Sequence, residues 1–186
     1  MRKYIRGRVA RNRAQAARYI LALCGLFLVV ILLQTTLFSH LRVFGTVPDL
    51  CYGTLLLVAY FCGRETGAVA GIASGFAVEA LGSVGVSLLP VVYLLCGYVC
   101  GHFTRAIVPR RFSAFAAVLG VGLPVRGAVT LIQVCLTYSS ISLPRILVQV
   151  ILPELLGTGL LALALYWPVR QLCRWIDPAA GAPGTA

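Results

Sequence analysis

Acidic residues and histidines are scarce in this sequence, which contains five Asp and Glu and two His among 186 residues. Metal sites and acid–base catalysis depend mainly on these side chains. His40 and His102 fall near opposite ends of predicted membrane spans, so they cannot share a metal ion. No His lies beside a candidate nucleophile, and the sequence has no glycine-rich phosphate loop and no pair of acids placed to face an aqueous cleft. We therefore expect a protein that is not an enzyme, with no catalytic residues, no cofactor and no metal site.

Charge of either sign is also limited, since 11% of the residues are charged against about 25% in soluble domains. Hydrophobic residues make up 60% of the chain, and the mean hydropathy is +0.93. These values indicate an integral membrane protein whose length fits one helix bundle. The seven cysteines are scattered through apolar runs, and only Cys96 and Cys100 share a helical face. We interpret all seven as small apolar side chains.

Basic residues are concentrated at the amino-terminal end. The net charge is +11, and seven of the 16 Lys and Arg lie in the first 18 residues. In so apolar a chain, membrane topology and anionic headgroups explain this excess better than nucleic acid does. The arm could lie on anionic lipid as an interfacial helix, or it could be a flexible positive-inside signal, and both readings fit equally well.

Six apolar runs predict six transmembrane helices. They cover residues 19–38, 48–62, 63–81, 86–103, 113–138 and 145–167. Pro48 and Asp49 are typical of a helix start, and Pro90 should kink the fourth helix. The second and third runs are short against the roughly 20 residues needed to cross a bilayer, so this hairpin is the weakest part of the count. We expect three regions: a basic arm (1–18), a transmembrane domain (19–168) and a tail (169–186) that is disordered at its end.

The distribution of charge predicts the orientation of these six helices. The two termini and the loops on their side hold 13 Lys and Arg, whereas the opposite side holds only Arg42 and Arg145. The positive-inside rule then places both termini in the cytoplasm.

A ladder of glycines marks the third run. Gly63, Gly67, Gly71 and Gly75 follow one another at steps of four, and Glu79 occupies the next place in the series. In water each interior glycine would weaken a helix by about 0.8–1 kcal/mol relative to Ala. In a bilayer the helix is enforced, and small residues at this spacing let a second helix approach closely. We expect these four glycines to form a packing face for a partner helix or for another helix of the bundle.

Three ionisable residues fall inside predicted spans, where charge is costly. At 1.5 Å per residue, Glu79 and Arg126 lie about 21 and 20 Å from the cytoplasmic ends of their helices. Glu154 lies about 14 Å below the outer end of the sixth predicted helix, and the apolar layer of a bilayer is about 30 Å thick. Because the three depths match, we expect Arg126 to bind Glu79, Glu154 or both as a buried polar clasp.

A series of short motifs resembles the bacterial rod shape-determining protein MreD family. The motifs are Leu-Gln-Thr-Thr-Leu-Phe at 33–38, Phe-Gly-Thr-Val-Pro-Asp-Leu at 44–50, Tyr60, the Arg64-Glu65 glycine run, and the series Glu79, Gly82, Gly85, Tyr93, Gly97-Tyr98 and Gly101. Together they cover residues 25–105. The chain departs from the family in having Glu79 where Asp is usual, in its long basic arm and in three arginines around Pro109.

The resemblance implies a non-catalytic component of the cell-elongation machinery in the bacterial cell membrane. Such a protein binds the single-span protein MreC and helps to couple MreB filaments, directly or indirectly, to peptidoglycan synthases. Its motif residues would be Gln34, Pro48, Asp49, Gly82, Gly97 and Gly101. The family fold is similar to the six-helix substrate-binding subunits of energy-coupling-factor vitamin transporters. That similarity supplies an alternative function, although the short outer connections and few polar groups argue against an outward-facing vitamin pocket.

Overall fold

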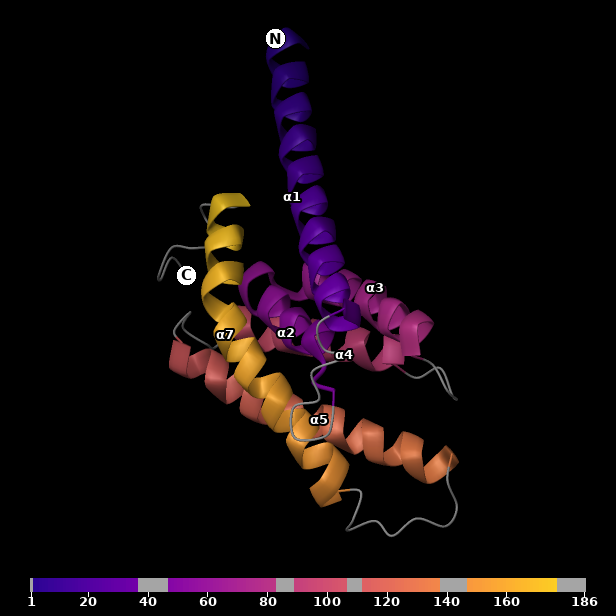
Figure 1. Ribbon diagram of the computed structural model, residues 1–186. Coiled ribbons are helices and arrows are strands. Elements are labelled where there is room, and N and C mark those ends of the chain that lie inside the picture. The colour runs from indigo at the N-terminus through magenta and orange to yellow at the C-terminus, as the bar shows by residue number, and fades with distance from the viewer. Residues whose placement is uncertain (1, 37–46, 83–88, 107–111, 138–146, 177–186) are drawn as a thin grey trace.

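The computed structural model describes residues 2–36, 47–82, 89–106, 112–137 and 147–176. Within these ranges the chain is helical and contains no strand (Figure 1). The elements are α1 (Arg2–Thr36), α2 (Leu50–Cys62), α3 (Arg64–Gly82), α4 (Leu89–Ala106), α5 (Phe112–Thr137), a short π-helical segment η1 (Leu147–Ile151) and α7 (Leu152–Ile176). The loop arginines Arg42, Arg110, Arg111 and Arg145, and most of the predicted connections, lie outside the described residues.

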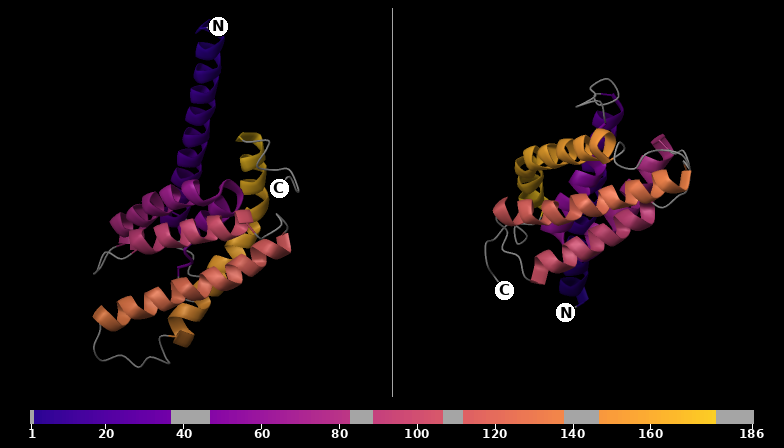
Figure 2. Two further views of the ribbon diagram at one scale, coloured as in Figure 1. Left: turned by 180° about the vertical axis from the view of Figure 1, so that it is seen from behind. Right: turned by 90° about the horizontal axis from the view of Figure 1, so that it is seen from below.

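Helix α1 unites the basic arm and the first apolar run in a single helix. Its amino-terminal part projects away from the other helices, with the N-terminus at the far end (Figures 1 and 2). Its carboxyl-terminal part packs against the other helices, which together form the body of the protein. There Val30 packs with Leu50 and Cys51 at the start of α2. The arm is therefore helical in the structure.

Helix α2 is the centre of the fold, since every residue from Leu50 to Phe61 is buried. A helix that is apolar on all sides is stable only when other elements surround it. Asp49 caps its amino-terminal end, as the sequence indicates, and Gly63 ends it with a φ of 90° that favours glycine. Its 13 residues give a helix of about 20 Å, shorter than the apolar layer of a bilayer.

Helices α3 and α4 form the closest helix pair, and the glycine ladder is the reason. A Cβ on Gly67 would lie 2.5 Å from the carbonyl oxygen of Gly97, and a Cβ on Gly75 would lie 2.5 Å from the Cα of Pro90. A Cβ on Gly71 would collide with the carbonyl group of Tyr93. The glycine groove is thus filled by α4, which runs antiparallel to α3, and it is not left open for a partner helix.

One member of the predicted packing face, Gly63, precedes α3 as the cap of α2, although its carbonyl carbon would lie 2.6 Å from a Cβ on Gly101 of α4. Gly101 on α4 extends the contact, because a Cβ there would lie 2.6 Å from the Cα of Arg64. The close approach therefore runs along both helices and depends on glycine on each side.

Helices α2 and α7 run parallel. Gly53 of α2 lies against Ala162 of α7, where an added Cβ would stand 3.0 Å from the alanine Cβ. Nine residues further along α2, the sulfur of Cys62 lies 3.6 Å from that of Cys173. Residue numbers therefore rise together along the two helices.

Helix α5 runs antiparallel to this pair. Tyr52 near the start of α2 reaches Gly122 of α5, whereas Tyr60 near its end meets Phe115, earlier in α5. Helix α5 thus runs opposite to α2 and α7, and α3 runs opposite to α4, as successive helices of one chain do when short connections join them.

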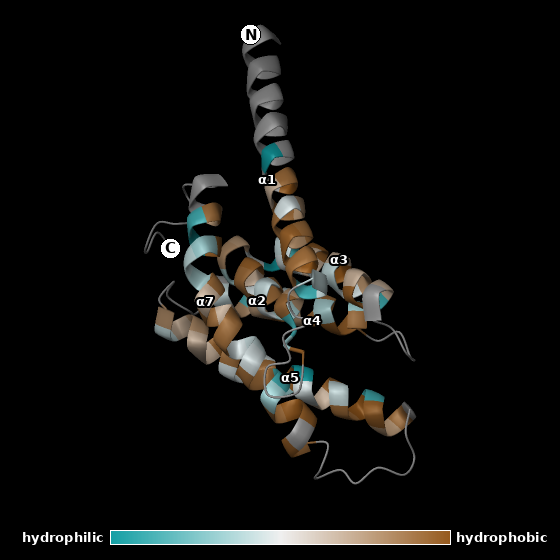
Figure 3. Ribbon diagram, viewed as in Figure 1, coloured by the Kyte–Doolittle hydropathy of each residue, from teal (hydrophilic) through white to brown (hydrophobic). Residues whose placement is uncertain are grey.

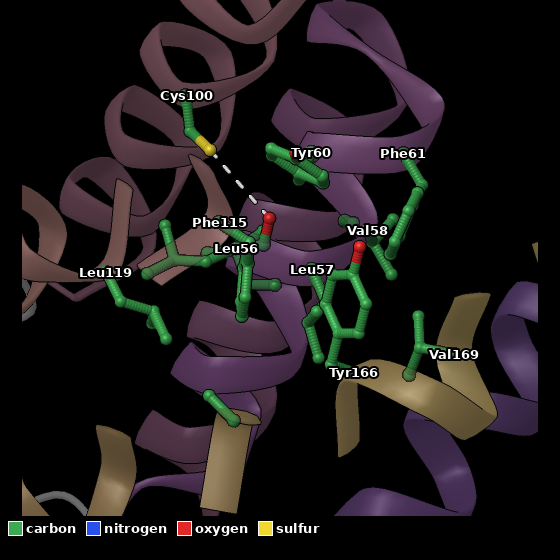
Figure 4. Close-up of a cluster of buried hydrophobic side chains, with 14 of the residues drawn as sticks. Leu56, Leu57, Val58, Tyr60, Phe61, Cys100, Phe115, Leu119, Tyr166 and Val169 are labelled. Carbon is green, nitrogen blue, oxygen red and sulfur yellow. Dashed lines mark hydrogen bonds between the residues drawn. The ribbon is translucent and has the colours of Figure 1, made fainter. Parts of the chain in front are cut away.

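The main apolar core lies where α2, α4, α5 and α7 meet (Figure 4). The ring of Phe115 lies 5.4 Å from that of Tyr60 and 5.5 Å from that of Tyr166, distances typical of aromatic pairs. The Cys100 thiol points to the Leu56 carbonyl oxygen at 3.8 Å. Large rings and branched side chains of α4, α5 and α7 thus pack around α2.

Two predicted features differ from the structure. Pro90 is the second residue of α4, where its missing N–H costs no helical hydrogen bond, so it begins the helix instead of kinking it. Helix α7 continues through Pro168 to Ile176, beyond the predicted domain end at 168. Val169 and Cys173 are buried in the core and hold this extension. Residues 177–186 lie outside the described part of the chain.

Many large apolar side chains of the described residues are exposed on the body. Figure 3 colours the ribbon by hydropathy and shows apolar residues along all of the labelled helices. Two described helices, Phe112–Leu136 and Leu152–Cys173, are long and apolar enough to cross a membrane. Three more apolar helices are shorter: Ile20–Thr36, Leu50–Cys62 and Leu89–Thr104. Length and composition alone therefore identify two candidate spans of the six predicted.

Candidate functional site

A buried polar cluster lies where the start of α2 meets α4, α5 and α7, and Asp49 is its centre. The side chain of Asp49 accepts a hydrogen bond from the Tyr52 N–H at 3.0 Å, which makes it the N-cap of α2. Its other carboxylate oxygen, Oδ2, accepts the Tyr93 hydroxyl of α4 and both Nε and Nη2 of Arg126, each nitrogen at 3.4 Å. Asp49 is only 4% exposed. One carboxylate therefore caps one helix and binds two others.

Arg126 is the cation of the cluster and comes from the middle of α5. Its Nη2 lies 3.4 Å from Asp49 and 3.6 Å from Oε1 of Glu154 in α7. Nη1 donates to the Thr130 hydroxyl at 2.6 Å, one turn further along α5. The guanidinium carbon also lies 5.8 Å from the centre of the Tyr93 ring. A guanidinium that is 8% exposed is thus held by two carboxylates, a hydroxyl and an aromatic face.

Two further hydrogen bonds attach neighbouring backbone to this cluster. The Asp49 N–H donates to the hydroxyl of Thr158 in α7 at 2.9 Å, and both residues are buried. The Cys51 N–H donates to Gln34 Oε1 in α1 at 3.2 Å. Together with the polar cluster, these contacts join α1, α2, α4, α5 and α7 around the start of α2.

Tyr52 connects the cluster to α5 by a separate route. Its hydroxyl donates to the Gly122 carbonyl oxygen at 2.7 Å, and its ring centre lies 5.2 Å from that of Tyr93. A side chain on Gly122 would crowd Leu56, so glycine allows α5 to lie close to α2 here. The tyrosine pair forms an aromatic wall beside the ion pairs.

Such a cluster is expensive to leave incomplete. Breaking a buried ion pair by removing one partner costs about 3–5 kcal/mol, because the remaining charge stays buried without its counterion. Replacing the whole set by apolar residues of the same shape can instead be neutral. The cluster therefore contributes little net free energy of unfolding when it is complete. Its main effect is to disfavour arrangements of the five helices in which one of its charges loses its partner.

The structure brings together part of the predicted clasp. Arg126 and Glu154 form an ion pair, but the second carboxylate is Asp49 and not Glu79. Glu79 lies near the end of α3, and its Oε2 atom is buried with no hydrogen-bond partner among the described residues. Matching depths do not establish proximity, because two residues at one level can lie on opposite sides of a bundle.

Sequence reasoning missed Asp49, Tyr93 and Tyr52 as parts of this cluster. It interpreted Asp49 as a helix start and as a motif residue of the resemblance, and Tyr93 only as part of the resemblance. The signal that could have found Asp49 is its place in the chain: it opens α2 just as Glu154 opens α7. Because these two helices are parallel and packed together, the start of α2 lies beside the second turn of α7, where the Asp49 N–H donates to the Thr158 hydroxyl, one turn beyond Glu154.

The family-motif residues lie within this region or in the glycine contact. Gln34 and Asp49 bond within the cluster, and Pro48 beside them is buried. Gly97 and Gly101 of α4 face α3, and Gly82 is the last residue of α3.

The described residues include no group of three or more His, Cys, Asp or Glu that could hold a metal ion. His102 is exposed on α4, with its ring stacked 6.2 Å from that of Tyr98, and His40 lies outside the described residues. The polar cluster is therefore the candidate functional site of the described chain.

Comparison with protein-family models, with curated proteins and with solved structures found no match for this chain.

Proposed function

We propose that the chain is a multi-pass protein of the bacterial cell membrane with six spans and both termini in the cytoplasm. Large apolar side chains on its outside support this, for example Leu21 and Val121, which are 78% and 70% exposed. Lipid covers such surfaces at no cost, whereas water does not. The alternating directions of α2, α5 and α7 also fit successive crossings.

The position of the arginines supports the same orientation. Arg64 follows the end of α2 by two residues, and Arg170 lies one turn before Cys173, which contacts Cys62 at that end. Both arginines thus lie at one end of the parallel pair. The basic arm, which is the amino-terminal part of α1, lies on the same side in this topology, where anionic lipid attracts it.

Within this membrane setting, the chain acts as a non-catalytic scaffold of the cell-elongation machinery. It binds an MreC-like single-span protein and couples MreB filaments to peptidoglycan synthases. One observation carries this proposal: residues of the MreD resemblance that the structure describes lie in the polar cluster and in the helix contact beside it. Asp49 and Gln34 bind in the polar cluster, while the glycines of α3 and α4 make the adjoining helix contact.

The filled glycine groove limits how a partner can bind. Because α4 occupies the α3 glycines, an MreC-like helix must use another face of the body. The glycine ladder then contributes to the rigidity of the scaffold and does not contact the partner.

The alternative function is a substrate-binding subunit of an energy-coupling-factor vitamin transporter. Such a subunit presents polar and aromatic groups to a ligand. Here Asp49, Arg126 and the tyrosines Tyr52 and Tyr93 use their polar atoms on one another and on backbone. This mutual pairing favours a structural cluster over a vitamin site.

Affinity purification from membranes tests the proposal. The tagged chain is expressed in a rod-shaped bacterium that lacks its own MreD, and bound proteins are identified by mass spectrometry. We expect MreC and elongation synthases to copurify, and rod shape to be restored. Asp49→Asn should reduce both results, whereas the exposed Glu65→Gln should not. Recovery of a transporter's coupling subunit and ATPases instead would establish the alternative.

A further inference from the structure

Two thiols face each other at the far end of the α2–α7 contact, away from the polar cluster. Cys62 is the last residue of α2, and Cys173 lies in the last turn of α7. Their sulfur atoms are 3.6 Å apart, although 111 positions separate the two residues in the chain. The other pair considered from the sequence, Cys96 and Cys100, lies on one helix, where a disulfide is rarely possible.

The geometry requires only a small approach to form a bond. A disulfide has a sulfur–sulfur distance of about 2.05 Å, so the two atoms must move closer by roughly 1.5 Å. Cys62 ends its helix, and terminal turns of helices open more readily than central ones. The packing of Gly53 on Ala162 already holds the two helices together elsewhere.

We propose that Cys62 and Cys173 are a reversible modification site, which a hydroperoxide converts to an intramolecular disulfide. Cys62 is partly exposed and Cys173 is buried, so Cys62 meets the oxidant first. This inference does not depend on the proposed function. In the proposed topology the pair lies at the cytoplasmic end, where thiols stay reduced until an oxidant appears.

The reaction balances in two steps. The Cys62 sulfur, as thiolate, attacks the terminal oxygen of the hydroperoxide; the O–O bond breaks, and the departing alkoxide takes up the thiol proton to give an alcohol. The Cys173 sulfur then attacks the resulting sulfenic sulfur, the S–O bond breaks, and the hydroxyl leaves as water with the Cys173 proton. Two thiols and one hydroperoxide thus give one disulfide, one alcohol and one water.

The bond would tie the end of α2 to α7 and close a long loop of the chain. Cross-links that close long loops restrict the unfolded chain most. The oxidised protein should therefore unfold at a higher temperature than the reduced protein, and a thiol reductant should reverse the shift.

Peptide mapping of the full chain tests this proposal. The purified protein in detergent micelles is treated with hydrogen peroxide, its remaining thiols are alkylated, and the digest is analysed without reduction. We expect a Cys62–Cys173 linked peptide that lacks two hydrogen atoms and disappears on reduction. Cys62→Ser should abolish it, and Cys24→Ser, at an exposed thiol of α1, should leave it unchanged.

Peptide mapping of the protein without substitutions decides whether Cys62 and Cys173 form a disulfide, even if a variant fails to fold. Recovery of Cys62 and Cys173 as alkylated or separately oxidised residues, under peroxide that oxidises Cys24, would overturn the proposal. So would linkage of either residue to another cysteine or to a second chain.

Discussion

Replacing Asp49 by Asn separates its two roles in the structure. Asn is as good an N-cap as Asp, so the bond from the Tyr52 N–H should survive. The charge facing Arg126 is lost, and an amide group replaces the acceptor of the Tyr93 hydroxyl and two guanidinium bonds. The variant therefore tests the ion pair without melting the start of α2.

The size of the effect follows from what Arg126 retains. Removing one partner of a buried pair costs about 3–5 kcal/mol. Since Glu154 still lies 3.6 Å from Arg126, the loss should fall near the lower end, at about 3 kcal/mol. Asp49→Ala also loses the cap and should cost about 1 kcal/mol more.

Equilibrium unfolding in detergent micelles measures these losses. Glu65→Gln, at an exposed carboxylate in the first turn of α3, is the matched control and should change stability by less than about 1 kcal/mol. The double variant Asp49→Asn, Arg126→Met should lose less than the sum of the single variants by more than about 1 kcal/mol. Equal losses for Asp49→Asn and Glu65→Gln, or additive losses in the double variant, would refute the ion-pair reasoning.

Three further predictions use the same unfolding measurement. Gly71→Leu should prevent α3 and α4 from packing and lower the free energy of unfolding by at least about 3 kcal/mol. Gly25→Leu, in open space on α1, should have little effect. Similar losses for the two variants would contradict the inference that α3 and α4 pack closely through glycine. Glu154→Gln should lower the free energy of unfolding by about 1–2 kcal/mol because Arg126 loses a counterion. Glu79→Gln should lower it by less, because one Glu79 oxygen is buried without a partner among the described residues. The reverse order would show that Glu79 stabilises the protein more than the Arg126–Glu154 ion pair does. Tyr52→Phe should cost about 1 kcal/mol through its lost bond to α5, and an unchanged midpoint would show that this bond contributes nothing.

Much of the helical architecture was predictable, because the apolar runs and their breaks are local features of the sequence. The cap at Asp49 and the close-packing role of Gly67, Gly71 and Gly75 follow from residue type and spacing. The identity of the helix in the glycine groove did not follow, because spacing describes one surface only. Whether all six runs cross a membrane is still a prediction.

The polar cluster was predictable only in part for a related reason. Depth along each helix placed Arg126 and Glu154 at similar levels, but it carried no information about which helices are neighbours. Glu79 matched by depth and yet lies outside the cluster. Asp49 was interpreted as a helix start, and its burial could not be predicted because it depends on helices that come much later in the chain.

The burial of α2 has a consequence for how the protein is made. As the chain emerges from the ribosome, Leu50–Cys62 is too short to cross a bilayer alone and begins with a carboxylate. The ion-pair partner of Asp49 follows 77 residues later, and the hydroxyl that accepts its N–H follows 109 residues later. In the proposed membrane topology, stable insertion of α2 would therefore wait for α5 and α7, and until then the nascent segment would depend on the insertion machinery to shield it from lipid.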